Sequence, residues 1–128
     1  MKILHDNRVA HRDIKPANFV LQEAGAVMKL MDFGTAKQLM KTDMTKTNLG
    51  SPYYMDNQIH QKNKYNAFDA DIWSMGVFLY HMCTGKVPYN AKSLNELREK
   101  VAKRKITYPR GINLSNCLKD LIEHIIVA

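Results

Sequence analysis

The chain has 128 residues, of which 45% are hydrophobic and 24% are charged, with a formal net charge of +7. This length predicts a single domain with the composition of an ordinary globular protein. No apolar run of about 18 residues or more is present, and the start of the chain lacks the apolar core of a signal peptide, so no membrane location is expected. Cys83 and Cys117 stand singly, which argues against a zinc site and favours free thiols in the reducing cytoplasm or nucleus.

The excess of Lys and Arg over Asp and Glu, 19 against 12, favours anionic partners. The densest basic segment is residues 100–105 (KVAKRK). It has two interpretations: the solvated end of a helix, or a patch that binds nucleic acid or an acidic partner. No aromatic residue is interleaved with these charges, as a base-stacking surface would require, so a nucleic-acid partner is the disfavoured prediction.

Turn residues and short apolar runs predict the elements of the first half of the chain. Residues 1–5 are typical of the last turn of a helix. The apolar runs 18–21 and 27–31 flank Gly25, which predicts two strands joined as a hairpin, the first of them buried. Residues 35–48 are polar and have no clear period, which predicts a long loop.

Three helices are predicted in the second half. Residues 69–83 are apolar nearly all the way round a helical wheel, which predicts a central helix buried on all sides and ended by Gly85. Residues 93–102 open with the Ser-x-x-Glu spacing of a capping box, and residues 115–126 are amphipathic. The positions predicted to face inward are Leu94, Leu97 and Val101 in the first of these helices, and Leu118, Leu121, Ile122 and Ile125 in the second.

Residues 11–18 (HRDIKPAN) bring polar and charged side chains to the edge of the predicted core. Asp13 could act as a general base, and Lys15, two residues on in an extended segment, would point to the same side and keep that carboxylate ionised. Asn18 offers a neutral oxygen ligand to a hard cation, and the hairpin would return Asp32 beside it to share a metal ion. A base, a cation for phosphate and a Mg²⁺ position together predict a phosphoryl-transfer site.

Five short motifs across the chain resemble those of one protein family. H-R-D-x-K-x-x-N at 11–18 and D-F-G at 32–34 resemble the signatures of the eukaryotic protein kinases. Residues 71–76 (DIWSMG) and 85–89 (GKVPY) are similar to that family's D-x-W-S-x-G helix and G-x-x-P-F turn, and residues 55–58 (MDNQ) fall where the family has A-P-E. Lys15 and the later G-S-P at 50–52 resemble Ser/Thr kinases rather than Tyr kinases.

The resemblance implies a fold and a set of roles. The fold would be mainly α with a small β-hairpin, the C-terminal lobe of the kinase-like α+β fold. Asp13 would be the catalytic base and Lys15 would steady the transferred phosphate of ATP. Asn18 and Asp32 would hold Mg²⁺, and Val20 would form part of the floor beneath the adenine.

Four further residues take supporting roles by the same resemblance. His11 and Phe33 would pack together under the site. Asp71 would tie the catalytic loop to the central helix by hydrogen bonds. Ser51 would line the pocket beside the acceptor hydroxyl of the protein substrate.

Regulation by an upstream activating kinase is also implied. Arg12, next to the base, marks kinases that are switched by phosphorylation of the activation loop, and Arg12 with Lys37 could form the cationic socket for the phosphate. Thr47 occupies the usual position of the phosphoacceptor, with Thr42 and Thr45 as weaker candidates. The alternative is that these threonines are ordinary loop residues.

The departures from the family pattern are as informative as the matches. The chain has no G-x-G-x-x-G loop, no V-A-I-K lysine, and Gln58 where A-P-E has its Glu. Residues 1–128 are therefore expected to be a partial kinase domain, the C-terminal lobe without the N-terminal lobe or the last helices. Such a lobe would bind nucleotide poorly and is expected to be inactive alone, with apolar surface left open to association.

Two functions of different class remain. The first is a Ser/Thr protein kinase acting on protein substrates, present here as a fragment. The second is a truncated, pseudokinase-like binding module that docks partners without turnover, which the missing motifs and Gln58 favour. The intact set of Asp13, Lys15, Asn18 and Asp32 favours the first, because a scaffold needs none of the four.

Overall fold

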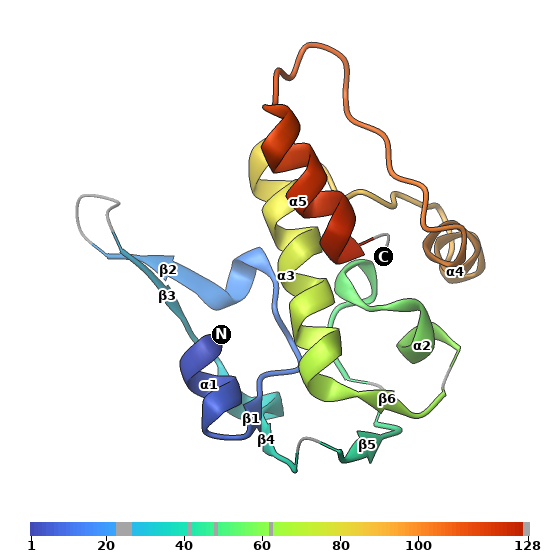
Figure 1. Ribbon diagram of the computed structural model, residues 1–128. Helices are drawn as coiled ribbons and strands as arrows, with labels where there is room; N and C mark the ends of the chain where they lie inside the picture. Colours follow the sequence, from blue (N-terminus) through green and yellow to red (C-terminus); the bar gives the residue numbers. More distant parts are fainter. Residues whose placement is uncertain (23–26, 41, 48, 62, 127–128) are drawn as a thin grey trace.

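The computed structural model describes residues 1–22, 27–40, 42–47, 49–61 and 63–126. Helix α3 (Ala67–Thr84) forms the centre of the molecule, and the other elements lie around it (Figure 1). Five α-helices and three two-stranded antiparallel sheets are present in these ranges. No helix among the described residues is long and apolar enough to cross a bilayer.

Helix α3 begins and ends with standard caps. The side chain of Asn66 accepts a hydrogen bond from Phe68 N, and Gly85 closes the helix in the left-handed conformation with φ 69°. The predicted helix is thus confirmed, but its burial on all sides was wrong. Ile72 and Met82 are exposed, because no described element covers those two faces of the helix.

Helix α5 (Asn116–Ile126) packs lengthwise against α3 (Figure 1). The contact is close at Gly76, where an added Cβ would overlap Cγ2 of Ile125. The indole of Trp73 donates to the carbonyl oxygen of Ile126 at 3.3 Å, and its ring stacks on Tyr89 with 6.3 Å between centroids. Trp73 is therefore part of the core.

Helix α4 (Leu94–Ala102) follows a long turn after α3. Ser93 Oγ accepts from Glu96 N at 3.2 Å, which confirms the predicted cap, although the Glu96 carboxylate accepts from Lys92 N rather than from Ser93. Leu97 and Val101 are buried, but the predicted inward position of Leu94 was wrong, since its side chain is 54% exposed. Leu121 of α5 was likewise misplaced: it is exposed, while Ile122 and Ile126 are buried.

Most of the buried apolar side chains form two clusters. One unites α3, α4 and α5, and the other lies between the start of α3 and the first half of the chain. The first contains Trp73, Val77, Tyr80, Tyr89, Leu97, Val101, Ile122 and Ile126, and the second Ala10, Leu39, Met55, Ile59, Tyr65, Ala67 and Ala70.

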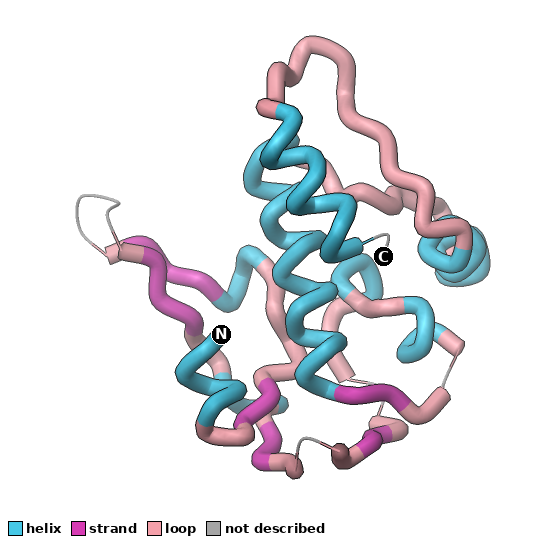
Figure 2. Tube along the Cα trace, in the orientation of Figure 1, coloured by secondary structure: helices cyan, strands magenta, loops and turns pink. Residues whose placement is uncertain are grey.

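The strands are short and lie at the periphery (Figure 2). The predicted hairpin is present as β2 (Phe19–Leu21) paired with β3 (Met28–Leu30), with Gly25 outside the described residues. Its predicted burial was wrong, because Val20 and Leu21 are exposed. The predicted loop at 35–48 contains two short strands that pair with distant segments, β1 (Val9–Ala10) with β4 (Lys37–Gln38) and β5 (Met44–Thr45) with β6 (Tyr65–Asn66).

Short helices complete the frame. Helix α1 (Lys2–Asp6) confirms the predicted helical turn at the start, and α2 (Asn57–His60) precedes β6. Within the described ranges, 3₁₀ turns cover Pro16–Asn18, Phe33–Thr35 and Pro52–Tyr54. Cys83 and Cys117 are free thiols, as expected.

Candidate active site

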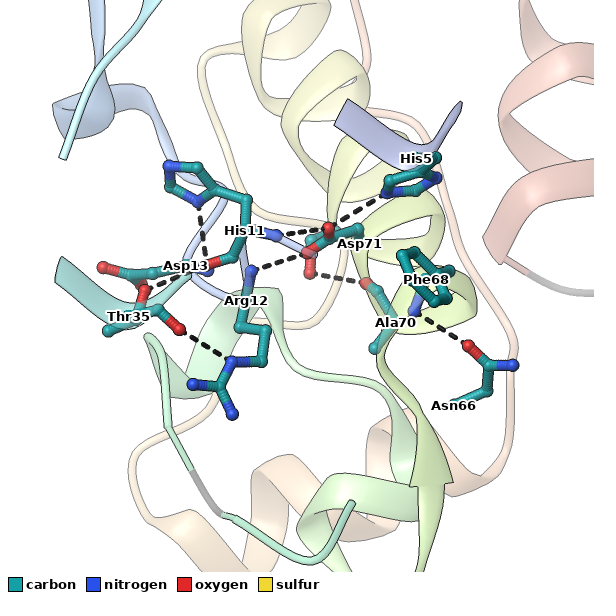
Figure 3. Close-up of polar contacts among 10 residues, drawn as sticks. His5, His11, Arg12, Asp13, Thr35, Asn66, Phe68, Ala70 and Asp71 are labelled. Atoms are coloured by element: carbon teal, nitrogen blue, oxygen red, sulfur yellow. Dashed lines mark hydrogen bonds and ion pairs between the residues drawn. The ribbon is translucent and has the colours of Figure 1, made fainter. Parts of the chain in front are cut away.

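The segment that begins at His11 is fixed to α3 by the buried carboxylate of Asp71 (Figure 3). The backbone N–H groups of His11 and Arg12 donate to its two oxygens, each at 2.7 Å. The ring Nε2 of His5, from α1, lies 3.1 Å from the same carboxylate. Because Asp71 is only 1% exposed, these charge-assisted bonds offset the cost of removing its charge from water. The predicted tie between loop and helix is confirmed.

A second set of bonds joins the loop at 11–13 to the turn at 33–35 (Figure 3). Arg12 Nε donates to the carbonyl oxygen of Thr35 at 2.7 Å, and Thr35 Oγ1 donates to that of His11 at 2.9 Å. The rings of His11 and Phe33 meet edge to face at 5.1 Å, which confirms their predicted packing. Arg12 itself is held at φ 68°, a left-handed conformation that costs free energy in a residue other than glycine.

The carboxylate of Asp13 contacts three side-chain donors. Lys15 Nζ lies 2.6 Å from its Oδ2, Asn18 Nδ2 donates to the same oxygen at 3.1 Å, and Ser51 Oγ donates to Oδ1 at 3.3 Å. Partial burial raises the pKa of Asp13, but these three donors outweigh it and hold the pKa below the ordinary value. Asp13 is therefore ionised at neutral pH, as a base must be.

Ser51 reaches Asp13 because of the residue before it. Gly50 has φ 111°, and a Cβ there would lie 2.8 Å from the carbonyl oxygen of Arg12. Only glycine permits both this conformation and this close approach. The segment that carries Ser51 therefore lies directly on the loop that carries Asp13.

Asn18 and Asp32 offer oxygen ligands at neighbouring points of the hairpin. The backbone N–H of Met31 donates to the Asn18 carbonyl at 2.7 Å, which holds the end of β3 beside Asn18. The Asn18 amide nitrogen donates to Asp13, which leaves its amide oxygen for a cation. Asp32 follows at φ 59° with Oδ1 accepting from Gly34 N at 3.2 Å. One carboxylate and one amide oxygen are ligands that fit Mg²⁺, with phosphate and water oxygens to complete its shell.

Val20 lies on the face of β2 opposite to Phe19. The Phe19 ring stacks on Phe78 of α3 at 4.5 Å between centroids, so that face of the hairpin packs on the core. Alternation along the strand turns Val20 the other way, and its side chain is exposed. It is free to contact a ligand, and its role beneath an adenine stays a prediction.

The predicted phosphate socket is not assembled in this structure. No hydrogen bond or ion pair between Arg12 and Lys37 or Thr47 is present among the described residues. Lys37 lies in β4, paired with Ala10, and is exposed. Thr47 is exposed too, and its carbonyl oxygen accepts from the hydroxyl of Tyr65 at 2.7 Å. The role of Thr47 as a phosphoacceptor is untested by this arrangement.

His5 and Thr35 are positioning residues that the sequence did not single out. His5 contacts Asp71, which lies 66 positions further along the sequence. Thr35 donates a hydrogen bond to His11, which lies 24 positions before it. Nothing in the spacing or periodicity of either residue marks it. Only the neighbourhood of Thr35, one residue past D-F-G, could have suggested it.

Asp56 and Arg104 form an unpredicted contact at the segment 55–58. Asp56 Oδ1 lies 3.8 Å from Arg104 Nη2, and Arg104 has φ 47° at the end of α4. The hydroxyl of Tyr89 is near both: burial, chiefly, with the charge of Asp56, raises the pKa of Tyr89 to about 12 although Arg104 opposes it. Gln58, which stands where A-P-E has its Glu, lies in α2 two residues after Asp56.

Comparison with known proteins agrees with the motifs. The family model for the protein kinase domain matches residues 1–128. The serine/threonine-protein kinase Nek5 of Mus musculus is 37% identical over 126 residues, which cover 98% of this chain and 20% of the relative. Nek5 of Homo sapiens is 40% identical over 126 residues, covering 98% and 18%. Serine/threonine-protein kinase ATG1b of Arabidopsis thaliana is 35% identical over 130 residues, again covering 98% and 18%. The chain spans no more than 20% of the length of these relatives.

Proposed function

Because the chain belongs to the protein kinase family, with Ser/Thr protein kinases among its relatives, we propose that it carries the catalytic loop of a Ser/Thr protein kinase. Its reaction would be the transfer of a phosphoryl group from ATP to a Ser or Thr hydroxyl of a protein. The observation that supports this most is the ionised Asp13 with Lys15, Asn18 and Ser51 bonded to it. We expect the protein to act in the cytoplasm or nucleus.

The proposed reaction uses Asp13 as the group that orients the acceptor. Its Oδ1 now accepts from Ser51, and a substrate hydroxyl would take up that same direction. As the hydroxyl oxygen bonds to the γ-phosphorus, the bond from that phosphorus to the bridging oxygen breaks, and ADP leaves with the electron pair. The hydroxyl proton passes to Asp13, and Lys15, two residues away, balances charge on the transferred group.

We expect the oxygen ligands Asn18 and Asp32 to bind Mg²⁺, and Val20 to contact ATP. Asn18 and Asp32 would hold the ion, which neutralises charge on the phosphates when bound. Val20 would contact the adenine. We further propose that residues 1–128 are the C-terminal lobe of a longer kinase domain, as the short share of each relative's length suggests.

The function is tested on the polypeptide as the source cells make it. An antibody against residues 56–66 would measure its size and capture it, and transfer of ³²P from labelled ATP to casein would follow. Asp13→Asn and Asp32→Ala should each reduce transfer by roughly 10²-fold or more. Asp69→Asn, an exposed change on α3, is the matched control and should keep full transfer. Equal transfer by all variants would refute the proposal.

The second candidate is a binding module without turnover. It is favoured by Asp56, Asn57 and Gln58 in the place where the family has A-P-E, together with the Asp56 contact to Arg104. If the captured polypeptide is no longer than this chain and transfers no phosphate, the module becomes the better proposal.

A further inference from the structure

A cavity of about 480 Å³ opens between the segment that follows α3 and the segment that follows α4. Its size is that of a pocket for a few side chains. Four lysines line it, and no Asp or Glu does: Lys86, Lys100, Lys103 and Lys105. The basic run at the end of α4, which phosphoryl transfer does not use, thus faces a cavity together with a lysine from the preceding turn.

The positive charge of this cavity is mostly uncompensated. Lys100 pairs with Glu96 Oε1 at 2.7 Å and donates to the carbonyl of Asn90. Lys86, Lys103 and Lys105 are exposed and form no ion pair with any residue in the described ranges. Three ammonium groups of one sign around a concave surface attract an anionic partner.

The walls between the lysines are apolar and favour a protein over a nucleic acid. Val87, Pro88 and Pro109 contribute apolar surface. The tyrosine rings are already engaged: Tyr80 is buried with its hydroxyl on the Thr107 carbonyl at 2.6 Å, and Tyr108 tilts against Tyr80. Bases would have no open ring on which to stack, whereas aliphatic side chains could enter the cavity.

The cavity is also distant from the candidate active site. Asp71 lies near the start of α3, Tyr80 lies four residues before its end, and Lys86 lies just beyond it. Tyr80 is the α3 residue that lines the cavity, and the nine-residue step along the helix from Asp71 to Tyr80 corresponds to about 14 Å. A ligand in the cavity would therefore leave Asp13 open.

We infer that this cavity is a docking site for an acidic segment of a partner protein, in which Asp or Glu alternates with apolar side chains. The carboxylates would pair with Lys86, Lys103 and Lys105, and the apolar side chains would contact Val87, Pro88 and Pro109. Docking is measured as binding, so it does not depend on phosphoryl transfer by Asp13.

The test uses fluorescence anisotropy with a short fluorescein-labelled peptide in which Glu alternates with Leu, and a second peptide with Gln for Glu. The triple variant Lys86→Glu, Lys103→Glu, Lys105→Glu should weaken binding of the Glu peptide roughly ten- to a hundredfold. The control triple, Lys29→Glu, Lys46→Glu, Lys64→Glu, reverses the same charge at exposed positions elsewhere and should weaken binding by about threefold or less. The Gln peptide should bind at least about tenfold more weakly than the Glu peptide.

Three results would overturn the inference. Equal losses in the two triples would show that net charge alone attracts the peptide. Equal binding of the Glu and Gln peptides would remove the role of the carboxylates. Tighter binding of a labelled oligouridylate, lost in the first triple only, would assign the cavity to single-stranded RNA.

Discussion

The two oxygens of Asp71 satisfy two backbone N–H groups that no other acceptor in the described ranges serves. Asp71→Asn keeps one acceptor and turns an NH₂ group toward the other N–H. A buried donor left unpaired costs about 1–3 kcal/mol, so we expect the free energy of unfolding to fall by that amount. Urea denaturation followed by circular dichroism measures it.

Asp69→Asn is the matched change two residues earlier on the same helix. Asp69 is exposed, so its replacement should cost less than about 1 kcal/mol. If both variants lost the same free energy, the charge at the helix start, and not the loop contact, would explain the loss in Asp71→Asn.

Asp13 should titrate below the usual value of 3.8, because its three donors outweigh the effect of burial on its pKa. With a depressed folded-state pKa, its contribution to stability is present above the unfolded value and is lost as the pH falls through the folded value. Lys15→Met removes the cation and should raise the pKa of Asp13. Carbon-detected NMR titration of the Asp13 carboxyl tests this, with Lys29→Met as control. An unmoved Asp13 pKa in Lys15→Met would show that the 2.6 Å contact does not persist in solution.

Among the helices, α3 and α5 meet at Gly76. An added Cβ would overlap Ile125 Cγ2 and lie 3.0 Å from Ile126 Cγ1. Gly76→Ala gains up to about 1 kcal/mol of helix propensity, but overpacking costs about 1–3 kcal/mol, so a net loss of stability is expected. Thermal unfolding measures it.

Ile125→Ala supplies the control, because it removes the side chain that the new methyl group would strike. The double variant should lose less than the sum of the two single variants, by about 1 kcal/mol. Additive losses, or a stabilising Gly76→Ala, would contradict the close packing of α5 on α3.

The ends of α2 and α4 are joined by Asp56 and Arg104. Arg104 adopts a left-handed conformation that costs about 1 kcal/mol relative to glycine, while Asp56 is largely buried beside it. Arg104→Gly should therefore destabilise the protein more when Asp56 is present than in the Asp56→Ala background. The coupling in this double-mutant cycle, measured by urea denaturation, should be about 1 kcal/mol. A coupling near zero would mean that the two side chains do not interact.

At the level of the whole molecule, a cavity of about 500 Å³ beside α1 and the hairpin is lined largely by apolar side chains. Ile3 is 78% exposed there, and Met28 is exposed as well. Apolar surface of this extent favours association. The sedimentation coefficient should rise with protein concentration, and Ile3→Gln with Met28→Gln should suppress the rise. Leu94→Gln with Leu121→Gln, which changes exposed side chains elsewhere, should not; suppression by both pairs would show that no particular face associates.

The sequence predicted what is local and missed what depends on distant contacts. The helix at 67–84 follows from its nearly continuous apolar residues and from Gly85, and the helices at 94–102 and 116–126 follow from apolar periodicity, with Ser93 as a cap of the first. The exposure of Leu94 and Leu121 did not, because periodicity ranks the faces of a helix without saying how far a neighbour extends. The strand at 37–38 could not be predicted either, since its two residues gain their pairing only from Val9 and Ala10.

In the candidate site, too, contacts between residues close in sequence could be predicted, and contacts between distant residues could not. Asp13, Lys15 and Asn18 lie within six consecutive residues, and their mutual contacts follow from that spacing and a turn at Pro16. The contacts of His5 with Asp71 and of Arg104 with Asp56 cross 66 and 48 positions, and require the packing of whole elements. The resemblance predicted the role of Asp71, but no motif predicted that His5 would be its third partner.

Trp73 is the single tryptophan of the chain, and it lies where α3 receives both Tyr89 and the end of α5. The molecule thus contains its own optical reporter. Release of α5 would free the indole N–H from the Ile126 carbonyl, admit water, and shift the emission to longer wavelengths while α3 remains helical. Emission and far-ultraviolet ellipticity recorded on one sample would then distinguish the release of α5 from the unfolding of α3.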